Sequence, residues 1–322
     1  VKRFKPLAVL GLATGVIIRG NLVNAFGGAL DSHGVWLEDC GGAAPWIVDN
    51  HMIAAAGDTN TTRVDGVRAI GDCHPIIDSN VRITGGAEGG TIGANGVYCG
   101  ANAGGTASNC LVVGNLLIEG SSNGFPPTAV GVRCDDGGCL RIADNFISGG
   151  GGMDAWGLYL GASGTLVERN TIWGVGRLTS GGVTGCASIS STGVYAEGSF
   201  ARLENNFISA GTCPPGGAAG AMTRWAGVVV SATPGPAEID VHSNVIDGRG
   251  VNAGTCRSTG LGFVATGVAG AGPHGVFRNN VIRSGDCGMA SVVAEASALA
   301  DPRIFENNDL DPFSAPPGGH VP

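Results

Sequence analysis

The sequence predicts an all-β fold: a single-domain solenoid of about ten stacked coils, stapled by disulfides. Three observations predict it. A strand-like phrase with a central Asn recurs ten times, a second strand that opens with glycine precedes most copies, and 59 of the 322 residues are glycine. The usual glycine share is roughly 7%. A unit this short cannot bury its own apolar face, so the copies must pack on one another to form one continuous core.

The recurring phrase reads, for example, IIRGNLV (17–23), LVVGNLLI (111–118) and RLENNFI (202–208). Apolar residues recur with period 2 on both sides of the Asn, which is typical of β-strands. The Asn residues marked by the phrase are Asn21, Asn50, Asn80, Asn115, Asn145, Asn170, Asn206, Asn244, Asn280 and Asn308. Their regular recurrence predicts one such Asn in every coil.

The second strand of each repeat begins with glycine and an aliphatic residue, as in GVWLED (34–39), GVYCG (96–100) and GVYAE (193–197). Stretches of Gly, Ala, Ser and Thr separate the strands, without a helical pattern between them. Each repeat therefore holds at least two short strands joined by turns.

The chain divides into three parts. Residues 1–15 form an N-terminal cap strand or a signal-like segment, residues 16–311 form the parallel β-helix, and residues 312–322 form a Pro-rich C-terminal tail. The first part is basic and then apolar, as in a signal peptide. It has no A-x-A-like cleavage site and runs directly into the first copy of the phrase, which favours a cap strand.

The strand–Asn–strand repeat and its Gly-rich turns resemble the right-handed parallel β-helix of the pectate-lyase-like superfamily, over about residues 15–310. The style of the repeats is also similar to secreted or surface β-helix proteins of myxobacteria. The resemblance implies that each marked Asn lies at the tight bend between two strands and stacks on its counterpart in the next coil. An Asn side chain tolerates the left-handed backbone of such a bend and can hydrogen bond along the stack.

Ten cysteines, an even number, occupy related positions in the repeats. Neighbouring coils bring equivalent positions to about 4.8 Å from one another, close enough for disulfides. The expected pairs are Cys40–Cys73, Cys99–Cys110, Cys134–Cys139, Cys186–Cys213 and Cys256–Cys287. Zinc is the alternative, but the chain has no CxxC and no close His–Cys cluster. Disulfides form in oxidising compartments, so we expect an extracellular or cell-surface protein.

Composition excludes two classes of function. The net charge is −8 and lysine occurs only as Lys2 and Lys5, so no basic face is available for nucleic acid. No run of 18 apolar residues exists that could span a membrane as a helix. We expect no metal and no cofactor; calcium stays open, although no three or four carboxylates converge in the sequence.

One outward stripe carries most of the distinctive side chains. In each Gly-led strand the second residue points inward, and the residue after it points outward. The outward residues are Trp36, Arg68, Tyr98, Arg133, Tyr159 and Tyr195. Three interpretations stay open: a ladder that stabilises neighbouring strands, an interface with another subunit, or a site that binds glycans on aromatic platforms.

The densest set of candidate catalytic residues is Asp135 and Asp136 with Arg133 beside them. Glu197 lies two coils further along, on the order of 10 Å from Asp135. That separation is near the roughly 6.5–9.5 Å between the carboxylates of inverting glycosidases. The other elements of a polygalacturonase-like signature are missing, and so is a lysine base of the lyase type.

The favoured function is therefore an extracellular structural or surface β-solenoid that self-associates through the ends of its helix, because open strand edges pair with further strands. The alternatives are a polysaccharide-active enzyme, either a lyase or a glycoside hydrolase, and a non-catalytic glycan-binding protein that uses the outward stripe. Polysaccharide is the ligand that both alternatives imply.

Overall fold

The structure is a computed structural model that describes residues 7–10, 15–26, 31–57, 61–86, 93–121, 126–175, 190–211, 224–231, 237–248, 257–264, 274–283, 292–295 and 301–311. These residues form β-strands, turns and bends without an α-helix. In keeping with this, no helix among them is long and apolar enough to cross a membrane. The chain is all-β, as the sequence predicts.

The strands form three parallel sheets, each of ten strands. The first sheet contains β1 (Leu7–Leu10), β4 (Asp31–Glu38), β7 (Arg63–Ile70), β10 (Gly93–Gly100), β13 (Thr128–Asp135), β16 (Asp154–Gly161), β19 (Ser190–Glu197), β22 (Arg224–Ser231), β25 (Arg257–Val264) and β28 (Val292–Glu295).

The second sheet contains β2 (Ile17–Arg19), β5 (Trp46–Val48), β8 (Ile76–Asp78), β11 (Cys110–Val113), β14 (Cys139–Ala143), β17 (Leu166–Glu168), β20 (Arg202–Glu204), β23 (Glu238–His242), β26 (His274–Arg278) and β29 (Asp301–Glu306). The third sheet contains β3 (Leu22–Phe26), β6 (Met52–Ala56), β9 (Ile83–Thr84), β12 (Ile118–Ser121), β15 (Phe146–Gly150), β18 (Thr171–Val175), β21 (Phe207–Gly211), β24 (Val245–Asp247), β27 (Val281–Arg283) and β30 (Asp309–Asp311).

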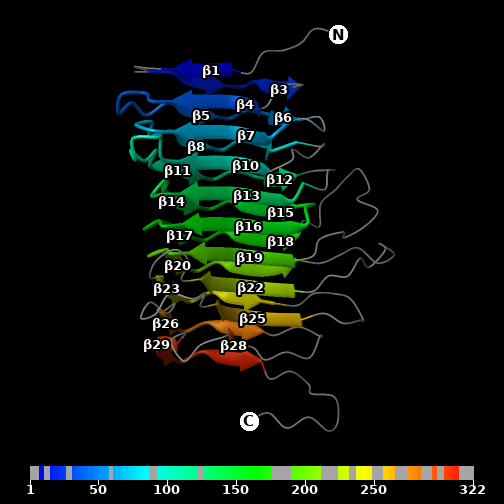
Figure 1. Cartoon of the computed structure of the whole chain (residues 1–322), viewed down its shortest axis with the longest axis vertical. Coiled ribbons are helices and arrows are strands. Elements are labelled where there is room, and N and C mark those ends of the chain that lie inside the picture. Colours follow the sequence, from blue (N-terminus) through cyan, green and yellow to red (C-terminus); the bar gives the residue numbers. More distant parts are fainter. Residues whose placement is uncertain are drawn as a thin grey trace, which may run out of the picture.

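Each coil contributes one strand to each sheet, and each copy of the Asn phrase supplies the strands of the second and third sheets. Figure 1 shows the coils stacked along the long axis, with the N-terminal coils at one end and the C-terminal coils at the other. Strand β1 pairs in parallel with β4 and thus belongs to the first sheet. The predicted tail, 312–322, lies outside the described residues.

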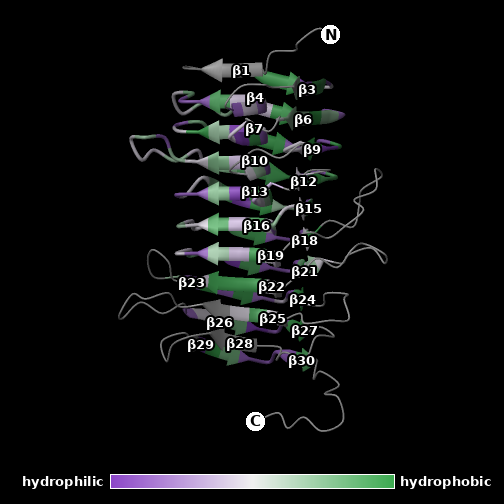
Figure 2. Cartoon of the chain, turned by 45° about the vertical axis from the view of Figure 1, so that its right-hand side comes forward, coloured by the Kyte–Doolittle hydropathy of each residue, from purple (hydrophilic) through white to green (hydrophobic). Residues whose placement is uncertain are grey.

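A continuous apolar core fills the space between the sheets. Val67, Ile77 and Ile83, one residue from each sheet of a single coil, have no exposed surface, and the same three positions are apolar in coil after coil. Each such side chain contributes about 1.5–3 kcal/mol on burial. The strands differ in their overall hydropathy: in Figure 2, β22 is hydrophobic along most of its length, whereas β13 carries hydrophilic residues.

Each marked Asn stacks on the next one through a repeated pair of hydrogen bonds. The backbone N–H of Asn50 and its Nδ2 both donate to Oδ1 of Asn80, at 3.1 and 2.8 Å. Nδ2 of Asn50 also donates to the carbonyl oxygen of Ile18 in the preceding coil, at 2.9 Å. The same pattern continues to Asn308 at the other end. The Asn ladder therefore satisfies polar groups in every coil, at a corner that is buried from Asn50 to Asn280.

The sequence predicts a left-handed backbone at the ladder Asn. In the structure the left-handed residue is instead the one before it. Asp49 and Asp144 have φ values of 53° and 59°. Equivalent positions in other coils hold Ser, Arg, Asn or Gly, also with positive φ. The ladder Asn therefore has a negative φ, and its side-chain amide faces its neighbours in the stack. The predicted left-handed position was wrong by one residue.

The Gly-led strands begin three residues earlier than the sequence suggests, and the glycine is the fourth of eight residues rather than the first. A Cβ on Gly131 would lie 2.5 Å from Cγ2 of Ile147 and 2.6 Å from the carbonyl oxygen of Gly157. The first and third sheets approach too closely here for any side chain, which explains why this position is glycine in successive coils.

Three predicted disulfides are confirmed. Cys40–Cys73 joins two neighbouring coils, while Cys99–Cys110 and Cys134–Cys139 each close the turn between the first and second sheets of one coil. The other two predicted pairs, Cys186–Cys213 and Cys256–Cys287, fall outside the described residues.

Candidate functional site

The outward stripe lies on the first sheet, where the register aligns its members in one column. Trp36 is opposite Arg68, which is opposite Tyr98 on the next strand. The column continues with Arg133, Tyr159 and Tyr195. Because the Gly-led strands repeat without a shift in register, the side chains stack directly over one another, about 4.8 Å apart along the helix.

Arginine and tyrosine alternate in the middle of this column. The Arg68 guanidinium lies 4.4 Å from the centre of the Tyr98 ring, and that of Arg133 lies 4.5 Å from the centre of the Tyr159 ring. Both distances are well within the range of cation–π attraction. The stripe therefore stabilises its own strands, as the ladder interpretation expects.

The next part of the column is aromatic, and it includes a residue that the sequence analysis missed. The ring of Trp156 stacks on Tyr159 and on Tyr195, with centroids 5.2 and 4.9 Å apart and interplanar angles of 20° and 13°. Trp156 lies three residues before Tyr159, and strict alternation would place it on the opposite face. The stacking shows that the alternation is broken between the two residues, where Gly157 lies.

The two candidate carboxylates, Asp135 and Glu197, occupy the same register column, with Gly161 between them. Asp135 accepts a hydrogen bond from Nε of Arg133 at 2.9 Å. Glu197 accepts a hydrogen bond from the Tyr159 hydroxyl. The two acids thus lie two strands apart on one face, about 10 Å from each other by strand spacing, and each is held by a side chain of the stripe.

These contacts also set the protonation of their partners. Burial, and then the hydrogen bond to Glu197, raises the pKa of Tyr159, so its hydroxyl stays protonated and keeps donating. Burial alone would lower the pKa of Arg133, but the charge of Asp135 outweighs it and the pKa is raised. Both groups are therefore fixed in their donor forms.

Asp136 does not join this arrangement. It is exposed and lies in the turn after β13, with a left-handed φ of 50°. The pairing of Asp135 and Asp136 in the sequence therefore does not produce a pair of carboxylates on one face of the structure.

A buried ionic cluster lies next to the stripe. Asp65 has no exposed surface, and its carboxylate is paired with Nδ1 of His33 at 3.2 Å and with Arg68 at 3.1 Å. Nδ2 of Asn95 donates to its other oxygen at 2.6 Å. Burial would raise the pKa of Asp65, but the hydrogen bond and charge of His33, with Arg68 and Asn95, lower it overall. His33 is only 3% exposed, so both members of this ion pair are buried.

A small pocket opens beside this cluster, with a volume of about 100 Å³. Its lining residues are Arg63, Gly93, Asn95, Tyr98, Thr128, Arg133 and Asp135. Tyr98, Arg133 and Asp135 belong to the predicted candidate residues. The other four lie in the first three positions of their strands, which have no strand-like pattern in the sequence.

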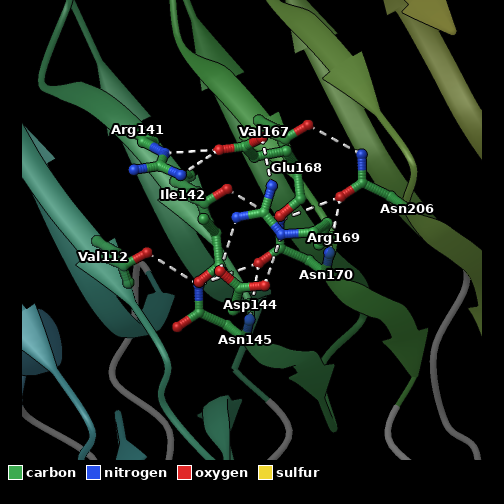
Figure 3. Close-up of polar contacts among 11 residues, drawn as sticks. Val112, Arg141, Ile142, Asp144, Asn145, Val167, Glu168, Arg169, Asn170 and Asn206 are labelled. Atoms are coloured by element: carbon green, nitrogen blue, oxygen red, sulfur yellow. Dashed lines mark hydrogen bonds and ion pairs between the residues drawn. The ribbon is translucent and has the colours of Figure 1, made fainter.

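A second polar network covers the outer face of the second sheet. Arg169 donates to both carboxylate oxygens of Asp144, at 2.8 and 2.9 Å, and also pairs with Glu168. Arg141 reaches Glu168 from the preceding coil at 2.7 Å. Figure 3 shows these ion pairs beside the Asn ladder. The two arginines and Asp144 are 42–45% exposed, so each pair contributes about 0–1 kcal/mol.

Nowhere in the described part of the chain do three or more His, Cys, Asp or Glu side chains come together in a way that could hold a metal ion. The His33–Asp65 pair has only two such groups, and both are committed to neighbouring side chains. The described residues therefore offer donors, acceptors and aromatic rings for a site, rather than a ligand set for a metal.

No protein-family model matches the sequence, and no curated protein matches it. The chain is similar to solved structures of the catalytic domain of a GH87 α-1,3-glucanase in complex with nigerose. Two aspartate-to-alanine variants of that domain are 12% identical to this chain, with TM-scores of 0.40 and 0.31, and a further structure is 11% identical with a TM-score of 0.31.

These matches cover 94% of this chain but only 56% of the glucanase chains. The chain thus spans little more than half the length of the structures it matches. Identities this low concern the fold alone and assign no activity to this chain. The comparisons therefore place the chain in no family.

Proposed function

We propose that this chain is an extracellular structural β-solenoid, a rigid shaft at a cell surface whose copies associate end to end. The observation that carries the proposal is the Asn ladder, which runs unbroken from Asn21 to Asn308. It joins every coil to the next by directed hydrogen bonds at a buried corner. Buried disulfides add covalent links and favour an oxidising, extracellular setting.

The ladder has a direction, which supports end-to-end association. Each Oδ1 accepts hydrogen bonds from the preceding coil, and each Asn donates to the following one. Oδ1 of Asn21 and the backbone N–H of Asn308 are the complementary groups at its two ends. A second copy stacked on the first would extend the ladder with unchanged geometry, and repeated head-to-tail contacts of this kind generate filaments.

Apolar side chains near both ends support the same proposal. Ile17 and Leu22 in the first copy of the phrase are 62% and 69% exposed, and Leu310 in the last copy is 41% exposed. Stacking would remove part of this surface from water, which contributes about 25 cal/mol for every Å² buried. The main-chain groups of the terminal strands would pair at the same time.

The experiment is negative-stain electron microscopy with sedimentation of the non-reduced protein. We expect filaments with an axial repeat of about 50 Å, which is ten coils of about 4.8 Å. Leu22→Lys should shorten or abolish them. Leu116→Lys is the matched control, because Leu116 is equally exposed, at 69%, on the side of the helix. A concentration-independent monomer, or equal effects of both substitutions, would overturn the proposal.

A polysaccharide-active or glycan-binding protein is the second candidate. It is favoured by the stacked Trp156, Tyr159 and Tyr195 rings close to two carboxylates on the same face. Aromatic rings suit the apolar faces of sugars, and the two acids have roughly the spacing of an inverting pair. A cleavage screen on polysaccharides tests it: Asp135→Asn and Glu197→Gln should each abolish cleavage, while Asp136→Asn retains it. If no polymer is cut or bound, this candidate fails.

A further inference from the structure

The pocket on the first sheet carries an excess of positive charge. Three arginines surround Tyr98: Arg68 is paired with Asp65, and Arg133 with Asp135. The third, Arg63, lies 5.6 Å from the Tyr98 ring centre.

In the described part of the chain no carboxylate lies within ion-pair distance of Arg63. Asp31 occupies the same register position on the preceding strand, but it is exposed and forms no ion pair with Arg63. One guanidinium is thus left without a counter-charge in a protein whose net charge is −8. Such a group is the natural attachment point for an external anion.

Space for a ligand is created by a single missing side chain. Arg63, Gly93 and Thr128 fill the first position of three consecutive strands, β7, β10 and β13. Gly93 has no side chain to fill the space between Arg63 and Thr128, so a hollow of about 100 Å³ remains there. This volume has room for the charged end group of a ligand, since a single water needs only about 10–15 Å³ of such space.

The lining supplies hydrogen-bond donors as well as charge. Tyr98 and Thr128, which each carry a hydroxyl group, line the hollow together with Arg63. Burial, and then the nearby Asp135 carboxylate, raises the pKa of Tyr98, so its hydroxyl keeps its proton. Asp135 also lines the hollow, where its charge is balanced by Arg133 and its free lone pairs can accept from a ligand hydroxyl.

We propose that this hollow binds the carboxylate or sulfate group of a hydroxylated ligand such as an acidic sugar, with Arg63 as the residue that holds the anion. The guanidinium fork matches the geometry of such an oxyanion and forms strong charge-assisted hydrogen bonds with it. The inference goes beyond the structural role and does not depend on it, because a rigid shaft can carry a ligand site on its side.

The test is a titration at low salt, followed by NMR or calorimetry, with glucuronate, glucose 6-sulfate and glucose. We expect saturable binding of at least one anionic sugar and at least tenfold weaker binding of glucose. The two anionic probes show which oxyanion the hollow selects. Binding of glucose as tight as that of both anions, or no saturable binding of any probe, would overturn the proposal.

Variants locate the site. Arg63→Gln should weaken anion binding about tenfold or more, in line with the loss of charged hydrogen bonds. Arg19→Gln, which makes the same charge change at an exposed ion pair on the second sheet, should leave it unchanged. Gly93→Thr should fill the hollow and abolish binding, and Thr128 shows that this register position accepts threonine. Unaltered binding in both Arg63→Gln and Gly93→Thr would place the anion elsewhere.

Discussion

Asn145 donates two hydrogen bonds to a single atom of Asn170: its backbone N–H and its Nδ2 both reach Oδ1, at 2.9 and 3.0 Å. Asn170 in turn donates from Nδ2 to the carbonyl oxygens of Ile142 and Glu168, each at 2.9 Å. Both Asn residues are almost fully buried. One side chain thus satisfies donors and acceptors of two coils, and water cannot replace it.

Asn170→Ala should therefore destabilise the protein strongly. The substitution removes the Oδ1 partner of the Asn145 backbone N–H and takes one further hydrogen bond each from Asn145 Nδ2 and the carbonyl oxygens of Ile142 and Glu168. Each lost hydrogen bond costs about 0.5–1.5 kcal/mol, and a buried group left unsatisfied costs about 1–3 kcal/mol. We expect a loss of at least about 3 kcal/mol in the free energy of unfolding, measured by urea denaturation with circular dichroism. Asn21→Ala is the control, because Asn21 is exposed at the first position of the ladder. Equal losses for both variants would contradict a contribution from the buried ladder.

The confirmed disulfides should stabilise the fold to different extents. Cys40–Cys73 closes a segment of 33 residues, and Cys134–Cys139 closes one of 5 residues. Chain entropy then predicts about 4 kcal/mol for the first and about 2 kcal/mol for the second. The double Cys→Ala variants, compared by denaturation, should lose stability in that order. The reverse order would show that native-state packing, rather than chain entropy, decides the contribution.

Gly131→Ala should be severely destabilising. The new methyl group would lie 2.5 Å from Cγ2 of Ile147 and 2.7 Å from the carbonyl oxygen of Ser148, which belong to the third sheet. Overpacking of this kind costs about 1–3 kcal/mol or more, measurable as a lower midpoint of thermal unfolding. Gly164→Ala is the control, since nothing lies within 4 Å of its added methyl group. If both variants unfold at the same temperature, the close approach of the two sheets is not a constraint.

Much of the fold was predictable because its signals are local and repeated. The Asn phrase marks a corner in every coil, and Val35, Val67 and Val97 mark the buried position that aligns the first sheet. Once this column is set, Cys40 and Cys73 fall next to each other. These inferences require only that side chains alternate between the two faces of a strand and that equivalent residues of successive coils lie next to each other.

The candidate site was less predictable because the period of two is broken within the strands of the first sheet. Asp65 lies three residues before Arg68, and Trp156 lies three residues before Tyr159. Alternation places the two members of each pair on opposite faces, yet in each pair they are in contact. The glycine between them allows the change of face, and the polar residues before it resemble a loop in sequence. A pocket that is lined by residues on both sides of this glycine cannot be predicted from alternation alone.

Asp65→Asn should show how the buried cluster depends on pH. The pKa of Asp65 is lowered in the folded protein by His33, Arg68 and Asn95, despite its burial. A lowered folded-state pKa adds stability above the unfolded value of about 3.9, and this stability is lost as the pH falls through the folded value. The asparagine variant keeps the shape, as Asn95 does at the same position of the next strand, but it removes the charge.

Wild type should therefore be more stable than Asp65→Asn by about 3 kcal/mol at pH 7, in line with breaking a buried pair. The difference should stay constant down to about pH 5 and shrink below about pH 4, as measured by urea denaturation at a series of pH values. Asp31→Asn, at an exposed position of the neighbouring strand, should change stability little at any pH. A wild-type advantage that persists undiminished at pH 2.5 would show that Asp65 contributes through shape rather than charge.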